Sequence, residues 1–298
     1  MAVSETDVPT DASAGPVPST TYDRFTIAPE DVVVHKWSCN AGTPTSAVVV
    51  LQHGFGEYAE RYISSHYKLI PKLQAEGFEV WALDFYGHGR SPGDRGMVNV
   101  VMAVRHHLEV RKRATERGLP VFLFGHSLGG LVTAGSVTSS PDDIAGVVLS
   151  SPVLPAAMSG LGQAALQVVA SIVPKTKVPL PRPPLDELCH DREQVRILME
   201  DPLKYKSGIS FSVASTAVKV VNLVWAAVDK WTAPTLAIHG TADSRAEHRQ
   251  CQSFVDKIAS QDKELFSIEG GYHELLNALE PEETFRHVVE WLHSCIAS

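Results

Sequence analysis

The stretch VFLFGHSLGGL, residues 121–131, contains the feature that decides the fold. It begins as an apolar run typical of a buried strand, continues as a G-x-S-x-G pattern and ends in small residues that suit a helix. The glycines on either side of Ser127 permit a turn tight enough to lift its hydroxyl above the edge of a sheet. The free N–H groups of the following helix would favour negative charge there. We therefore interpret Ser127 as a nucleophile rather than an incidental serine in a glycine-rich turn.

Short β-type runs recur on both sides of this stretch, and helical patterns lie between them. From the third run onward they are continuously apolar, as parallel strands covered on both faces are. The alternation predicts an α/β fold with a mostly parallel central sheet flanked by helices. The predicted strands are 32–37, 47–52, 78–84, 121–125, 145–151, 235–240 and 264–270. The predicted helices are 64–76, 98–117, 127–138 and 282–295.

One long segment, residues 153–231, shows helical patterns and proline breaks but no strand pattern. We interpret it as a helical cap above the carboxyl ends of the strands, where open α/β sheets bind ligands. A second helical domain with no role at the site is the alternative. The predicted organisation is a disordered tail (1–21), two parts of one α/β core (22–152 and 232–298), and the cap between them.

Composition excludes several classes of protein. The chain has 298 residues, a formal net charge of −8 and no basic stripe, which argues against nucleic acid as a partner. Its four cysteines lie far apart without metal-ligand spacing, so we expect reduced thiols and no metal site. The N-terminus lacks the pattern of a secretory signal, and no apolar run is long enough to span a bilayer. These features predict a cytoplasmic protein.

A serine nucleophile needs a base, and the base needs a carboxylate. Among 13 histidines, His273 follows the last apolar strand run in IEGGYHELL, where the loop returns to the sheet edge. Asp243 follows the preceding strand run in TLAIHGTADSRAEH. The chain order serine, acid, histidine matches the order in α/β-hydrolases. Glu247 and Glu269 are the alternative acids.

Acyl transfer also requires donors for an oxyanion. The backbone N–H of Leu128, which follows the nucleophile, is one candidate. The second is the N–H of Phe55, in the glycine-bearing loop that follows the strand run of VVVLQHGFGEYAERY, residues 48–62. Glycines there let the backbone rather than a side chain face the substrate.

Together these residues resemble the monoglyceride lipase or lysophospholipase-like branch of the α/β-hydrolases, also called the serine aminopeptidase S33 group. The resemblance covers about residues 32–292 and rests on six motifs: HGFGEYAERY, ALDFYGHGRSPGDRG, GHSLGG, DPLKYKSGIS, HGTADSRAEH and GGYHELLN. It implies an α/β-hydrolase fold, a Ser127–Asp243–His273 triad, an oxyanion hole at Phe55 and Leu128, and no metal or organic cofactor. It also implies that Glu57 and Arg61 form a polar pair beside the site.

The sequence departs from that pattern near the site. Ser244-Arg245-Ala246 replaces the usual hydrophobic residue and proline after the acid, and Phe55 is bulkier than is common. These departures affect the substrate more than the reaction. Glu57 and Arg61 have two interpretations: a structural ion pair, or a contact with the alcohol half of the substrate.

The resemblance implies a serine ester hydrolase acting on monoacylglycerol or a similar lipid ester through an acyl-enzyme. An esterase or lactonase for another small ester, an acyltransferase, and a ligand-binding receptor with residual hydrolysis are the alternatives. The segment 161–173 has apolar residues spaced to line an acyl tunnel. Transient contact of the cap with membranes or lipid droplets is also expected, and no oligomeric state is predicted.

Overall fold

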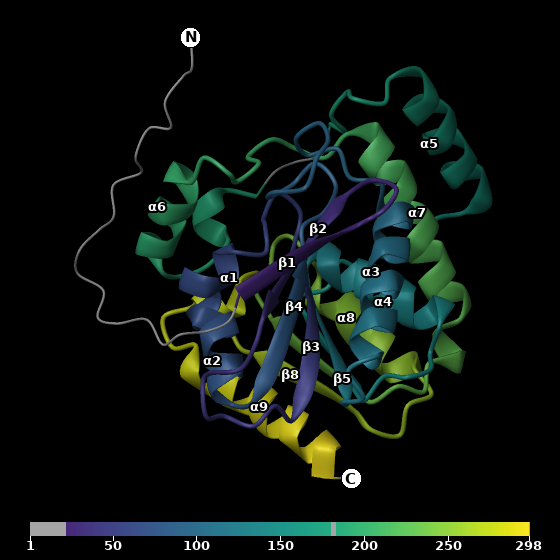
Figure 1. The fold of residues 1–298 in the computed structure, drawn as a ribbon. Helices are drawn as coiled ribbons and strands as arrows, with labels where there is room; N and C mark the ends of the chain where they lie inside the picture. Colours follow the sequence, from purple (N-terminus) through teal and green to yellow (C-terminus); the bar gives the residue numbers. More distant parts are fainter. Residues whose placement is uncertain (1–21, 180–182, 298) are drawn as a thin grey trace.

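The computed structural model describes residues 22–179 and 183–297, so the predicted tail at 1–21 lies outside the described residues. Its centre is an eight-stranded sheet in the order β1-β2-β4-β3-β5-β6-β7-β8 (Figure 1). Strands β1 and β2 pair in antiparallel fashion, as do β2 and β4, and the remaining neighbours are parallel. The mostly parallel sheet predicted from the sequence is confirmed. The strands are β1 (Tyr22–Ile27), β2 (Val32–Trp37), β3 (Ala47–Gln52), β4 (Phe78–Leu83), β5 (Val121–His126), β6 (Gly146–Ser150), β7 (Thr235–Gly240) and β8 (Lys263–Ile268).

Helices cover both faces of the sheet because the central strands are apolar on both faces. Along β3, Val48 and Val50 join one hydrophobic cluster, while Val49 and Leu51 join the other. This alternation follows from the two-residue period of a strand. One face is covered by α3 (Val100–Thr115), α4 (Leu128–Ser139) and α8 (His248–Lys257); the other is covered by α1 (Arg61–Ser64), α2 (Leu69–Ala75) and α9 (Glu282–Ala297).

The segment between β6 and β7 contains three helices, α5 (Gly160–Ile172), α6 (Arg192–Glu200) and α7 (Phe211–Ala226). Helix α7 packs on α3 and α4 and places Val213, Val220 and Val224 in the core. Helices α5 and α6 lie far apart at the upper end of the molecule (Figure 1). Within the described part of this segment the only β-type pairing is an isolated bridge, Lys177 to Ser210. Short 3₁₀ turns complete the order: η1 (His66–Lys68), η2 (Leu185–Glu187), η3 (Val228–Lys230) and η4 (Leu275–Asn277).

One helix boundary and one strand differ from the prediction for identifiable reasons. The helix expected over 64–76 has its main part only from Leu69, because His66, Tyr67 and Lys68 have positive φ angles of 51°, 55° and 54°. Strand β1 was not predicted. It is an edge strand, and all but its last residue are at least partly exposed, so it lacks a continuous apolar run. Among the described residues, no helix is long and apolar enough to span a membrane.

Candidate active site

Ser127 occupies the sharp turn between β5 and α4. Its φ of 55° and ψ of −119° lie outside the regions that a non-glycine residue normally adopts, a strain of order 1–3 kcal/mol. The turn is held by the Ser127 N–H, which donates to Ser150 O at 3.0 Å, and by the Val153 N–H, which donates to Ser127 O at 3.1 Å. Gly129 lets the helix approach β3, since a Cβ there would lie 2.1 Å from Gln52 O. The local sequence therefore sets the serine at the sheet edge.

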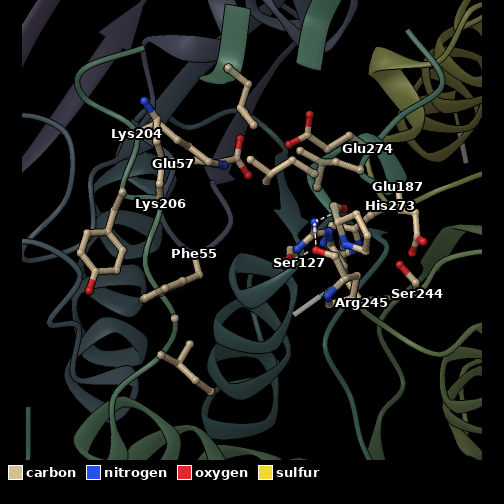
Figure 2. A pocket seen from close by; sticks show the side chains of 18 of the residues that line it. Phe55, Glu57, Ser127, Glu187, Lys204, Lys206, Ser244, Arg245, His273 and Glu274 are labelled. Carbon is tan, nitrogen blue, oxygen red and sulfur yellow. Dashed lines mark hydrogen bonds between the residues drawn. The ribbon is translucent and has the colours of Figure 1, made fainter. Parts of the chain in front are cut away.

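The loops after β7 and β8 bring an aspartate and a histidine to that serine. The Ser127 hydroxyl lies 2.8 Å from His273 Nε2, and His273 Nδ1 lies 2.7 Å from Asp243 Oδ2. An ionised carboxylate only accepts hydrogen bonds, so His273 carries its proton on Nδ1 and presents Nε2 to the serine as an acceptor. Figure 2 shows Ser127 and His273 meeting at the pocket. The three residues selected from the sequence thus form one hydrogen-bonded chain.

Asp243 is fixed by further bonds. Its Oδ1 accepts the N–H groups of Arg245 (2.8 Å) and Ala246 (3.0 Å), and His239 Nε2 lies 3.2 Å from Oδ2. Burial raises the pKa of this carboxyl, but hydrogen bonds from His239 and His273 outweigh burial, and the net pKa lies well below the ordinary value. Asp243 therefore stays ionised.

The two alternative acids do not reach His273. Glu247 is exposed and faces Arg249 at 3.4 Å. Glu269 is exposed near the end of β8.

The two proposed oxyanion donors come from two different segments next to the pocket. Leu128 is the first residue of α4, and Phe55 lies in the loop after β3. Neither backbone N–H donates a hydrogen bond to another described group. Asp84 pins the chain just after this loop, because its Oδ1 accepts the Ala59 N–H at 2.8 Å. Both N–H groups are therefore available to a ligand, and their assignment as oxyanion donors stays a prediction.

Glu57 and Arg61 belong to a buried ionic cluster. Arg61 donates to Glu57, and its two terminal nitrogens bond Glu274 at 3.0 and 2.9 Å. Asn277 Nδ2 also donates to Glu274 Oε2, at 2.6 Å. Burial opposes the ionised form of Glu57, yet neighbouring Lys204 and Arg61 hold its pKa well below the ordinary value. Glu57 lines the pocket, whereas Arg61 supports the cluster from outside the lining.

This cluster is the one place among the described residues with a geometry that could hold a metal. Ligand atoms of Glu57, His66, His126 and Glu274 all lie within 4.8 Å of one another. The Arg61 guanidinium already bonds both carboxylates, however, so a further cation would meet strong repulsion. The donor set therefore fits an internal ion pair better than a metal centre.

The pocket above Ser127 has a volume of about 770 Å³, which is within the range of small-molecule sites. Residues between β6 and β7, most of them in the segments that flank α6, supply most of its lining. Apolar lining residues include Phe55, Val153, Val178, Leu188, Leu198 and Ile209.

The expectation that residues 161–173 line an acyl tunnel is wrong. No residue of α5 is among the residues that line the pocket, and Leu161 and Ile172 are 83% and 73% exposed. The segment forms the helix α5, but the spacing of its apolar residues does not tell whether they face the pocket or solvent.

Five charged residues line the pocket besides Glu57, and sequence reasoning gave none of them a role: Glu187, Lys204, Lys206, Arg245 and Glu274. All of them except Glu187 lie inside motifs already quoted: DPLKYKSGIS, HGTADSRAEH and GGYHELLN. Arg245 donates to the carbonyls of Pro183 (3.1 Å) and Pro184 (2.9 Å), so it connects the acid loop to the cap. The available signal was the place of these charged residues inside the quoted motifs.

The sheet order, the strained serine turn and the Ser127–His273–Asp243 chain define an α/β-hydrolase of the serine hydrolase type. Residues 43–281 match the family described as serine aminopeptidase, S33, and the chain belongs to that family.

Similar proteins come from distant sources. Human monoglyceride lipase is 32% identical over 263 residues, 84% of this chain and 83% of that protein. A monoacylglycerol lipase of Mycolicibacterium smegmatis is 28% identical over 85% of this chain and 90% of its own length. The crystal structure of Paleococcus ferrophilus monoacylglycerol lipase superposes with a TM-score of 0.75 at 31% identity, covering 93% of this chain and 99% of that one.

Proposed function

We propose that this protein hydrolyses the ester bond of monoacylglycerols, with Ser127, His273 and Asp243 as its catalytic triad. The observation that carries the proposal is the hydrogen-bonded chain from Ser127 to His273 to Asp243 beneath a capped, partly apolar pocket. The monoglyceride and monoacylglycerol lipases among its relatives support the choice of substrate.

The proposed reaction follows from the proton positions. His273 Nε2 takes the hydroxyl proton of Ser127, and Ser127 Oγ attacks the ester carbonyl. The N–H groups of Phe55 and Leu128 bind the resulting oxyanion. His273 then gives the proton to the leaving alcohol, and the acyl group stays on Ser127. In the second half His273 deprotonates a water, which attacks this acyl-enzyme and releases the fatty acid.

We test this proposal by measuring the turnover of monoacylglycerols of graded chain length by the purified protein. We expect multiple turnovers by the wild type and none by Ser127→Ala, which should fold normally because the side-chain change is small. A serine-reactive fluorophosphonate should label only the wild type. Labelling of the variant would contradict the assignment of the nucleophile, and turnover that stops at one per molecule would favour a receptor.

The product distinguishes transfer of the acyl group to an alcohol from hydrolysis of the ester. Adding an alcohol acceptor should leave free fatty acid as the main product of a hydrolase. A new ester as the main product would instead identify an acyltransferase.

We also propose that α5 brings the protein to the lipid surface that holds its substrate, making it peripheral to membranes or lipid droplets. Its exposed apolar side chains, which include Leu161, Val168 and Ile172, cost free energy in water. Leu161→Glu with Ile172→Glu should lower turnover of monoacylglycerol in vesicles but not of a water-soluble ester. An equal fall for both substrates would exclude this role.

A further inference from the structure

The pocket contains an ammonium group without a hydrogen-bond partner among the residues that the structure describes. Lys204 lies between α6 and α7 and lines the pocket on the same side as Glu57 (Figure 2). Desolvation lowers the pKa of Lys204, and Glu57 is the neighbour that most opposes this shift. No ion pair joins Lys204 to a carboxylate within the described chain, although Glu57 is its principal electrostatic neighbour.

The backbone around Lys204 is fixed against the proposed oxyanion loop. The N–H of Tyr205 donates to Gly56 O at 2.9 Å, and the Tyr205 ring packs edge-on against Phe55 with centroids 5.6 Å apart. Asp201, three residues before Lys204, accepts a hydrogen bond from Tyr58 at 2.7 Å. The ammonium group therefore projects from an anchored segment.

The opposing carboxylate is close to the reacting bond. A Cβ built on Gly54 would lie 2.7 Å from Glu57 Oε1 and 3.1 Å from Ser127 Cβ, so Glu57 and the nucleophile flank the same glycine. A substrate whose carbonyl is bound at Ser127 would place its nearest substituents within reach of Glu57. Acyl chains are apolar, so the polar half beside this carboxylate is the alcohol.

Charges of both signs lie around this point, and Glu187, Lys206 and Arg245 also line the pocket. Glu57 and Glu274 are opposed by Arg61 and Lys204, and Arg61 bonds both carboxylates. An anionic head group would meet two carboxylates, and a cationic one would meet two cations. Because an ammonium only donates and a carboxylate only accepts, the group that satisfies both at once is a hydroxyl.

We infer that Lys204 and Glu57 together bind a hydroxyl group on the alcohol half of the substrate, which makes Lys204 a specificity-determining residue. The inference rests on the proposed hydrolysis of monoacylglycerols and assigns recognition of a free glycerol hydroxyl to a residue of the cap segment. The hydroxyl accepts from Lys204 and donates to Glu57. This role of Lys204 was not expected from the sequence, where only Glu57 and Arg61 were considered as contacts for the alcohol half.

The test compares esters of one fatty acid whose alcohol halves differ by single groups: propyl, 2-hydroxyethyl, glyceryl and glyceryl phosphate. Wild type should prefer the 2-hydroxyethyl ester to the propyl ester, which has nearly the same size. Lys204→Met should lower kcat/KM for the hydroxylated esters about 10- to 100-fold, as for loss of a hydrogen bond to a charged group, and change the propyl ester far less. Lys175→Met is the matched control, because that cap lysine is exposed and pairs with Asp94.

Each outcome decides the inference. Lack of preference for hydroxyethyl over propyl in the wild type would overturn it without any variant, even if Lys204→Met did not fold. Equal losses on all esters would make Lys204 structural. A preference for the glyceryl phosphate ester that depends on Lys204 would replace the hydroxyl with an anion. Failure of wild type to turn over any ester would instead overturn the proposed function.

Discussion

Replacing Asp243 with Asn is the sharpest test of the triad, because the structure predicts which contacts survive. The amide oxygen of Asn can still accept the N–H groups of Arg245 and Ala246, which bond Oδ1 at 2.8 and 3.0 Å. The amide nitrogen then replaces Oδ2, 2.7 Å from His273 Nδ1. That nitrogen only donates, so His273 must carry its proton on Nε2 instead. It can then no longer accept the Ser127 proton.

The expected loss is large. In a serine protease triad the corresponding substitution lowers kcat about 10⁴-fold. That factor corresponds to about 5.5 kcal/mol of barrier, at about 1.36 kcal/mol for each tenfold change. Folding should survive, because both backbone bonds to Oδ1 are kept and His239 Nε2 still bonds Ala246 O at 3.0 Å.

The assay is kcat for a p-nitrophenyl ester, with thermal unfolding measured on the same samples. Glu247→Gln is the control, because Glu247 is exposed and should change kcat little. A kcat loss below about tenfold for Asp243→Asn, with the fold intact, would refute the assigned tautomer. A larger loss for Glu247→Gln than for Asp243→Asn would show that the wrong acid was chosen.

Two further predictions concern the surroundings of the triad. Burial lowers the pKa of His66 to about 3 and of His126 to about 4, so both stay neutral when folded but gain a proton in the unfolded chain below about pH 6.5. The free energy of unfolding should therefore fall as pH drops below that value, by about 2 kcal/mol for each histidine at pH 5. Urea unfolding that is unchanged between pH 7 and pH 5 would contradict this prediction. Gly56→Ala should lower stability and kcat together, because Gly56 has a φ of 79° and a Cβ there would lie 2.5 Å from Tyr205 O. Gly42→Ala, with a φ of 86° and open space around it, should cost only the backbone strain of about 1 kcal/mol, so equal losses for the two variants would show that the cap contact does not hold the loop.

Sequence reasoning located the sheet and selected the three residues that form the hydrogen-bonded chain, because both depend on local patterns. Three predicted strands, β2, β3 and β7, have the bounds found in the structure, since each is a short β-type run that stands out from the sequence around it. Ser127, Asp243 and His273 each follow such a run, and parallel strands deliver their carboxyl ends to one edge of the sheet.

The polar cluster could not be assembled in the same way. Arg61 and Glu274 are separated by 213 positions, and nothing local to either residue indicates the other. Lys204 lies on the same side of the pocket as Glu57 because the neighbouring Tyr205 N–H bonds Gly56 O and holds this cap segment against the loop after β3. The apolar residues of α5 were expected to face the pocket, but they are exposed. Whether the apolar face of a helix contacts protein or solvent depends on tertiary packing, which the local sequence does not show.

Residues placed by the strand ends and residues placed by the cap segment therefore have different roles. The triad is built from the ends of β5, β7 and β8, so the fold fixes its geometry whatever ester is bound. Lys204 comes from the cap, and Arg245 connects the acid loop to the cap. Changes in these residues can alter which ester fits while leaving the Ser127–His273 distance intact. Substitutions that change the ratio of activities between esters should therefore be found in the cap and its contacts, and substitutions that abolish all activities should be found at the sheet edge.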